Sequence, residues 1–253
     1  MRSHLELSNL YEYDDYSCPA DWKVDEELSQ VHRIYYCYGG DVDYESPQQK
    51  IKLKNNTLYL FPILKSYHMV HNADDPLKCL FFHVTLTKLL LNDIIEVPIH
   101  KDSVEEHAVM ILKKWIEAKK SRSDIINALN IIISAVEEKH ELKYIEDERI
   151  NSAISFMKTN YPEKITNEKL AQMINIDHRY FIRIFRKNCG CTPQKYLSEY
   201  RLFQASKLLA ADYSVYQVAK MVGYEDAKAF SRFFKSATLQ TPTEYKESYY
   251  LQP

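Results

Sequence analysis

Two stretches of this chain repeat each other: YFIRIFRKNCGCTPQKY at residues 180–196 and AFSRFFKSATLQTPTEY at residues 229–245. Each has aromatic and basic residues at near-helical spacing, followed by a Thr-Pro pair and a Tyr. At an offset of 49, Arg183 aligns with Arg232, and Thr192-Pro193 aligns with Thr241-Pro242. A Thr hydroxyl caps free backbone amides and Pro suits the first helical position, so Thr-Pro is typical of a helix start. The repeat therefore predicts two copies of one helical unit.

A second helix is expected ahead of each repeated stretch. At an offset of 48, Ala171 aligns with Ala219, and Asn175 aligns with Gly223. A small Ala lets two helices approach closely, and Asn or Gly can take the positive φ that a tight turn needs. One helix-turn-helix match is a weak signal, but two ordered copies joined by a long helix over residues 193–211 are specific. At 1.5 Å per residue that helix spans about 28 Å, which suits two DNA-reading helices about one duplex turn, roughly 34 Å, apart.

The second helix of each copy divides into an apolar face and a basic face. The apolar residues at i, i+3, i+4 spacing, expected in the core, are Phe181, Ile184, Phe185, Phe230, Phe233 and Phe234. The residues expected at the DNA are Arg179, Ile182, Arg183, Arg186, Ala227, Lys228, Ser231, Arg232 and Lys235. An α-helix fits the major groove, and Arg and Lys reach phosphates and guanine edges. A single such stripe is as well explained by a solvated helix face; two in register within a basic domain favour DNA binding.

Residues 149–245 resemble the DNA-binding region of the AraC/XylS family of bacterial transcription regulators. The motifs that carry the resemblance are LAQMINIDHRYFIRIFRKNCGCTPQKYL, from Leu170, and VAKMVGYEDAKAFSRFFKSATLQTPTEY, from Val218. The resemblance implies binding to double-stranded promoter DNA, usually transcription activation, with RNA polymerase as a partner and commonly a homodimer. One departure is Leu239, where the family usually has a Gly like Gly190. Leu resists the left-handed helix cap, so we expect this turn to differ or the second subdomain to be less stable.

The N-terminal half has a different pattern. Short β-rich runs with turns between them cover residues 31–86 and predict a small sandwich or barrel. Two amphipathic helices are expected next, with Val104, Ala108, Ile111, Leu112 and Trp115 on one stripe of the first. The predicted fold class is α+β multidomain. Its expected parts are a cupin-like β-barrel sensor at 1–86, a helical dimerisation region at 87–140, a linker at 141–148 and an all-α double helix-turn-helix domain at 149–253.

The β-rich half resembles the cupin-like effector domain of the same family, through LKNNTLYLFPILKSYHMVH at residues 53–71. Aromatic walls with few polar groups are typical of ligand pockets. The candidates for contact with a small-molecule effector, such as a sugar, are Tyr36, Tyr38, Tyr59, Phe61 and His68. Core packing explains these residues equally well.

An enzyme is the main alternative to a regulator. A metal-binding cupin needs a His-x-His pair with a later Glu and His, whereas His68 and His71 are three apart and His83 stands alone. We therefore expect no metal, no other cofactor and no catalytic residues. A cupin-type enzyme with a helical nucleic-acid-binding appendage stays as the alternative. A DNA alkyl-repair protein is a third option, but its reactive-Cys and zinc-Cys clusters are absent from the sequence.

Charge and cysteine content agree with a cytoplasmic regulator. From Arg149 onward there are 16 Lys and Arg against 9 Asp and Glu, a net charge of +7, while the first 148 residues hold 17 against 26, a net charge of −9. This asymmetry suggests that only the C-terminal part meets a polyanion. The 5 Cys show no disulfide framework, and we expect buried thiols, including Cys191. No apolar run approaches the roughly 20 residues of a membrane-spanning helix, and no secretory signal is expected.

Overall fold

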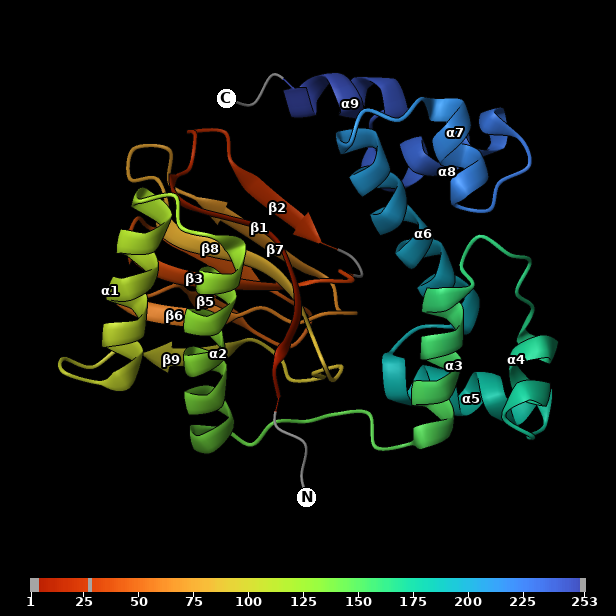
Figure 1. The fold of residues 1–253 in the computed structure, drawn as a ribbon, viewed down its shortest axis with the longest axis horizontal. Coiled ribbons are helices and arrows are strands. Elements are labelled where there is room, and N and C mark those ends of the chain that lie inside the picture. Colours follow the sequence, from red (N-terminus) through yellow and green to blue (C-terminus); the bar gives the residue numbers. More distant parts are fainter. Residues whose placement is uncertain (1–4, 27–28, 251–253) are drawn as a thin grey trace. The chain divides into compact units, whose positions relative to one another are not determined.

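The protein consists of two compact units, Met1–Ile145 and Glu146–Pro253. The computed structural model describes residues 5–26 and 29–250. The N-terminal unit combines β-sheets with helices, and the C-terminal unit is helical (Figure 1). The expected two-part α+β architecture is therefore confirmed.

Two antiparallel sheets form the frame of the N-terminal unit within the described residues. The first sheet has the strand order β1-β8-β3-β6-β9, with β1 Leu7–Ser17, β8 Lys78–Leu86, β3 His32–Gly39, β6 Thr57–Leu60 and β9 Ile95–Pro98. The second has the order β2-β7-β4-β5, with β2 Lys23–Glu26, β7 Tyr67–His71, β4 Val42–Glu45 and β5 Lys50–Lys52. No hydrogen-bonded ladder joins the two sheets in the described part of the chain, so the expected closed barrel is corrected to two stacked sheets.

The strands also extend beyond the expected range 31–86. Two of them, β1 and β2, precede it, and β9 lies inside the segment expected to be helical. The short Ile-Glu-Val-Pro run of β9 pairs with the edge of β6, where Ile95 lies opposite Leu60. Four residues are too few to show a helical or a strand period, so only this pairing defines the strand.

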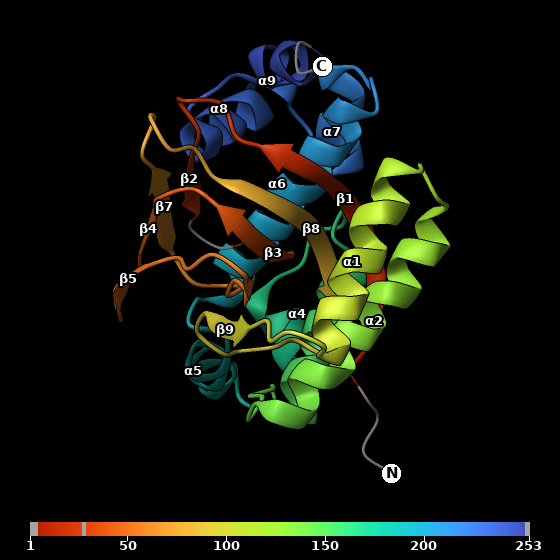
Figure 2. The ribbon, with the colours of Figure 1, turned by 90° about the vertical axis from the view of Figure 1, so that its left-hand side faces the viewer.

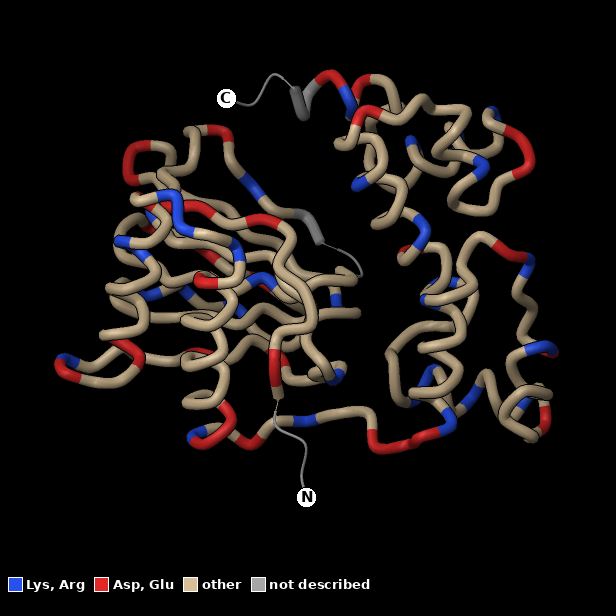
Figure 3. Tube along the Cα trace, in the orientation of Figure 1, with Lys and Arg blue, Asp and Glu red and all other residues tan. Residues whose placement is uncertain are grey.

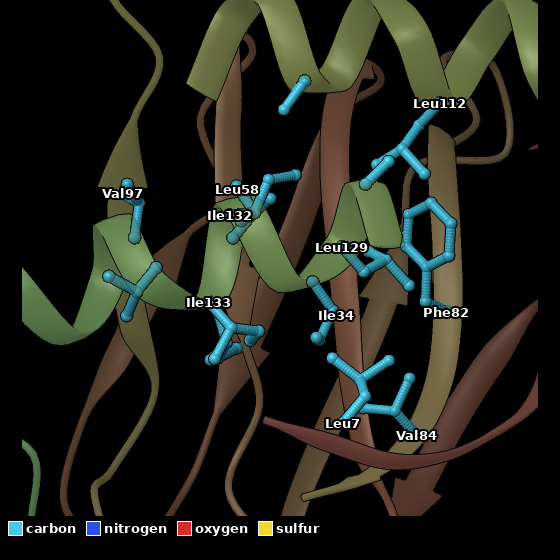
Figure 4. Close-up of a cluster of buried hydrophobic side chains, with 14 of the residues drawn as sticks. Leu7, Ile34, Leu58, Phe82, Val84, Val97, Leu112, Leu129, Ile132 and Ile133 are labelled. Carbon is cyan, nitrogen blue, oxygen red and sulfur yellow. The ribbon is translucent and has the colours of Figure 1, made fainter. Parts of the chain in front are cut away.

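Helices α1 Val104–Glu117 and α2 Arg122–Lys139 cover one face of the five-stranded sheet (Figure 2). Each begins at a serine, Ser103 or Ser121, whose hydroxyl accepts a hydrogen bond from a backbone amide of the first turn. Strand residues such as Ile34 and Phe82 meet helix residues such as Leu112 and Leu129 in a shared core (Figure 4). Most of the apolar surface of these helices is thus used on their own sheet.

A second core lies between the two sheets. Residues of the five-stranded sheet, including Tyr35 and Tyr59, pack there with Tyr44, Tyr67 and Met69 of the four-stranded sheet. Alternate residues of a strand face opposite sides of a sheet, so the three central strands β8, β3 and β6 contribute to both cores.

The segment expected to be a linker at 141–148 is partly bound to the N-terminal unit. The backbone N–H of Leu91 donates to the carbonyl of Lys143 at 2.7 Å. The side-chain amide of Asn92 donates to the carbonyl of Glu141 at 2.9 Å. Residues 90 and 144 also form an isolated β-bridge. The chain therefore leaves the first unit only after these contacts, and the second unit starts at Glu146.

The C-terminal unit is a series of short helices around one long helix. Its helices are α3 Glu148–Thr159, α4 Asn167–Met173, α5 His178–Cys189, α6 Pro193–Ala210, α7 Val215–Met221, α8 Ala227–Thr238 and α9 Pro242–Tyr250. Within the described residues, no helix combines the length and the apolar character that crossing a bilayer requires.

Candidate nucleic-acid interface

Two helix-turn-helix subdomains are present, α4–α5 and α7–α8. In the first, Asn175 takes a φ of 53° between the helices, and in the second Gly223 takes a φ of 84°. Both second helices start at an aspartate cap: the carboxylate of Asp177 accepts from the Tyr180 amide, and that of Asp226 accepts from the amides of Lys228 and Ala229. These amides hold the pKa of each carboxyl below its ordinary value. The two turns thus have the same construction.

The second turn requires glycine for space as well as for conformation. A Cβ built on Gly223 would lie 2.5 Å from the carbonyl oxygen of Pro162. That distance is well inside van der Waals contact with backbone, which cannot move aside as a flexible side chain does. The first turn has Asn175 at this position, whereas a side chain at position 223 would clash with the backbone of Pro162.

The aromatic faces of α5 and α8 hold each helix to a subdomain core. Four of the phenylalanines are fully buried: Phe181, Phe185, Phe230 and Phe234. The phenylalanine at 233 is only half-buried, and its ring stacks on Tyr224 at a centroid distance of 5.4 Å. Deep burial of one face fixes the rotation of each helix and leaves the opposite face to solvent.

The basic stripes lie on that opposite face in both helices. The six exposed cations are Arg179, Arg183, Arg186, Lys228, Arg232 and Lys235. The other three expected DNA-facing residues, Ile182, Ala227 and Ser231, are half-buried, and the Ser231 hydroxyl donates to the carbonyl of Ala227 at 2.8 Å. Lys and Arg recur along the helices of this unit (Figure 3). Each stripe thus presents three charged side chains beside half-buried residues, one in α5 and two in α8, and its contact with DNA stays a prediction.

The two helix ends after these stripes have the same geometry despite different residues. Gly190 caps α5 at φ 74°, ψ −11°, and Leu239 caps α8 at φ 63°, ψ −1°. The prediction of a different turn at Leu239 is therefore wrong, whereas lower stability of the second subdomain stays a prediction. Leu239 takes the left-handed conformation with its side chain 86% exposed, so its strain is not offset by packing.

The connector α6 holds the two subdomains. Its start at Pro193 is capped by the Thr192 hydroxyl, as the sequence predicts. Its 18 residues give a length of about 27 Å. Tyr196, Leu197, Ala205 and Leu209 are buried along it, so the helix is part of both cores rather than a free spacer.

The cysteine pair beside the first cap is buried. The side chains of Cys189 and Cys191 are both free thiols. Burial raises the pKa of Cys191 to about 11 and raises that of Cys189 further. Both thiols are therefore protonated at neutral pH, as expected of core residues.

The five candidate effector residues do not form one wall. Tyr59 and Phe61 lie in the core between the sheets, where the Phe61 ring is within 6.1 Å of the rings of Tyr35, Tyr44, Tyr59 and Tyr67. The sequence did not single out Tyr35, Tyr44 and Tyr67, because their partners lie on other strands.

The other three candidates point elsewhere. Tyr36 and Tyr38 lie on the helix-covered face of β3, where the Tyr36 hydroxyl donates to Asn56 at 2.6 Å and the Tyr38 hydroxyl donates to Asp15. On β7, His68 is half-buried between Tyr67 and Met69, whose side chains enter the inter-sheet core. Side chains alternate along a strand, so one interior cannot include all five, and the expected single lining is corrected.

A comparison with protein families matches residues 170–248 to a family described as "Helix-turn-helix domain". These residues include both stripes and the connector between them. Residues 170–248 form an AraC-type helix-turn-helix domain. The AraC-type domain identified from the sequence motifs is thereby confirmed.

Curated relatives match about two-fifths of this chain. The lactose operon transcription activator of Staphylococcus xylosus is 34% identical over 106 residues, which are 42% of this chain and 38% of the relative. The transcriptional regulatory protein HptR of Staphylococcus aureus (strain NCTC 8325 / PS 47) is 33% identical over 100 residues, 40% of each chain. This chain thus spans about two-fifths of the length of the relatives it matches.

Solved structures match the fold of both units. ToxT from Vibrio cholerae has a TM-score of 0.70 at 11% identity and covers 94% of this chain and 98% of its own. A second ToxT structure, with (E)-4-(8-methylnaphthalen-1-yl)but-3-enoic acid bound, has a TM-score of 0.72 at 10% identity, with 95% and 100% covered. At this identity the likeness concerns the fold alone: a sheet-rich N-terminal unit followed by a helical unit with helix-turn-helix subdomains.

Proposed function

We propose that this protein is a sequence-specific DNA-binding transcription regulator. The observation that carries the proposal is the pair of recognition helices, each with a buried aromatic face and three exposed cations at the same positions. Two such helices on one connector are suited to successive major grooves on one side of a duplex. The names of the relatives, which are a transcription activator and a regulatory protein, support this function over a cupin-type enzyme. Promoter DNA and RNA polymerase are the proposed partners, and the cytoplasm is the proposed location.

DNA binding is tested with the segment upstream of the protein's own gene. We expect a preference for that duplex over a random one at about 150 mM salt, and an affinity that falls as salt rises, because phosphate contacts release counterions. Fluorescence anisotropy of labelled duplexes measures both. Equal affinity for the two duplexes, with and without candidate effectors, would contradict the proposal.

We propose further that the N-terminal unit binds a small-molecule effector. The supporting feature is its aromatic core between two sheets that share no strand ladder in the described residues, with Tyr59 and Phe61 as the retained candidates. Among the ToxT structures, one has an unsaturated fatty acid bound. Thermal-shift screening with sugars and with long-chain unsaturated fatty acids separates the two ligand classes. Stabilisation that Phe61→Ala removes is expected for a ligand held at this core.

A homodimer through the α1 and α2 helices is the last part of the proposal. These helices use their buried faces on their own sheet, yet they still expose four apolar side chains: Val104, Met110, Ile111 and Ile131. Exposed apolar groups of this kind are suited to a second copy of the chain.

A further inference from the structure

The loop at residues 160–165, between α3 and α4, contacts both helix-turn-helix subdomains. By sequence it belongs to the first subdomain, since α4 follows it directly. Its Tyr161 ring, however, packs against the core of the second subdomain, which is built around Phe230 and Phe234. The same ring meets Tyr200 of the connector edge-on at 5.5 Å. We refer to residues 160–165 as the bridging loop.

Arg201, in the middle of α6, binds this loop with two hydrogen bonds. Its Nε donates to the carbonyl of Tyr161 at 2.8 Å, and its Nη2 donates to the carbonyl of Glu163 at 2.8 Å. The planar guanidinium can make both bonds at once because its donors form a rigid fork. The guanidinium also lies 5.9 Å from the centre of the ring of Tyr224, the residue that follows Gly223 in the second subdomain. One side chain therefore joins the bridging loop, the connector and the second subdomain.

Two further contacts hold the bridging loop, one at Pro162 and one at Ile165. The carbonyl oxygen of Pro162 lies 2.5 Å from the position that a Cβ of Gly223 would take, so the loop backbone and the turn at Gly223 are in direct contact. The side-chain amide of Gln194, at the start of α6, donates to the carbonyl of Ile165 at 3.1 Å and to the side-chain oxygen of Asn167 at 3.1 Å. The loop is thus held between the connector and both subdomains.

The connector is packed into both cores, but a helix can still bend along its length and let the two subdomains shift relative to each other. A second attachment between the same parts removes that freedom. We propose that Arg201 and the bridging loop form a clamp that fixes the relative position of α5 and α8 and so selects the spacing between two DNA half-sites. This inference rests on the proposed DNA binding and makes Arg201 a positioning residue, since it acts through the loop. Binding two grooves at once then requires little reordering, which favours one spacing.

The test uses the full chain and a duplex that the wild type selects from a random pool, with its half-sites located by footprinting. The spacing between half-sites is changed by one and two base pairs, and a single half-site is included. The variants are Arg201→Met and Arg201→Lys, because an ammonium cannot supply the two-bond fork. The matched control is Lys207→Met, which removes a cation from the same helix.

We expect the wild type to show a sharp affinity optimum at one spacing. Both Arg201 variants should lose about 10-fold at that optimum, lose much less at altered spacings and bind the single half-site as the wild type does. The control should leave the shape of the spacing profile unchanged. If Arg201→Met unfolds the C-terminal unit, Arg201→Lys provides the same comparison.

The test distinguishes a failure of the clamp from a failure of the proposed DNA binding. If the wild type selects no duplex, the proposed function fails and the clamp with it. If the wild type selects a duplex but shows no spacing optimum, or folded Arg201 variants keep its profile, the clamp is overturned while DNA binding stands. An equal loss on the single half-site by a folded variant would make Arg201 a direct DNA contact and would also overturn the clamp.

Discussion

At the scale of single residues, Leu239 has a conformation that its side chain opposes. Leu239→Gly should stabilise the C-terminal unit by about 1 kcal/mol, because the left-handed conformation costs a non-glycine residue roughly 1–2 kcal/mol and the exposed side chain gains little from packing. Calorimetry should show the unfolding transition of this unit about 4 °C higher. The matched change Gly190→Ala, at the equivalent cap, should lower it. An unchanged or lower transition temperature in Leu239→Gly would contradict the inference that the Leu239 backbone is strained.

Tyr196 is the second residue whose substitution should stabilise the protein. Its side chain is fully buried, and its hydroxyl has no hydrogen-bond partner among the described residues. A buried hydroxyl without a partner costs free energy, so Tyr196→Phe should leave the free energy of unfolding unchanged or raise it by about 1 kcal/mol.

The control for Tyr196 is Tyr59→Phe. Tyr59 is equally buried, but its hydroxyl accepts a hydrogen bond from the Lys54 amide at 2.8 Å. Its loss should lower the free energy of unfolding by about 1 kcal/mol, because the amide is left without its partner. Urea denaturation measures both variants, and equal destabilisation by the two would show that the Tyr196 hydroxyl has a partner after all.

At the scale of elements, each recognition helix is divided between a core face and a basic face. Arg183→Glu and Arg232→Glu should each weaken specific DNA binding by at least about 100-fold, because reversal replaces an attraction to phosphate or guanine with repulsion. Circular dichroism should stay native, since both side chains are exposed. The control Lys50→Glu reverses an exposed cation of the N-terminal unit and should not affect binding. A melted C-terminal unit in either variant would contradict the assigned faces.

At the scale of the whole molecule, the open question is self-association. We expect sedimentation velocity to show a dimer at micromolar concentrations, and Ile111→Lys to shift it to a monomer by placing a charge in the α1–α2 surface. The control Tyr216→Lys changes an apolar residue that is 58% exposed on the C-terminal unit and should leave the dimer intact. A wild type that is monomeric throughout would exclude this interface.

The sequence alone determined the features that repeat within a few residues. The division of α5 and α8 follows from 3.6 residues per turn, so Phe181 and Arg183 could be assigned to opposite faces without a structure. The left-handed positions at Asn175 and Gly223 follow from residue type in the same way. The caps Asp177 and Asp226 also stand 49 residues apart, so the repeat contains a signal for both caps.

Features that depend on partners far away in the sequence required the three-dimensional structure. Strand β9 exists because β6 presents an edge to it, and the pattern of four residues does not reveal that edge. Tyr36 packs against the core beneath the helices, and Phe61 lies in the core between the sheets. This difference depends on which face of the five-stranded sheet the helices cover. Arg201 binds carbonyls about 40 residues earlier in the chain, and backbone carbonyls carry no sequence identity. Local periodicity therefore determined the two recognition helices, whereas long-range contacts decided the sheet edges and how the two helices are held together.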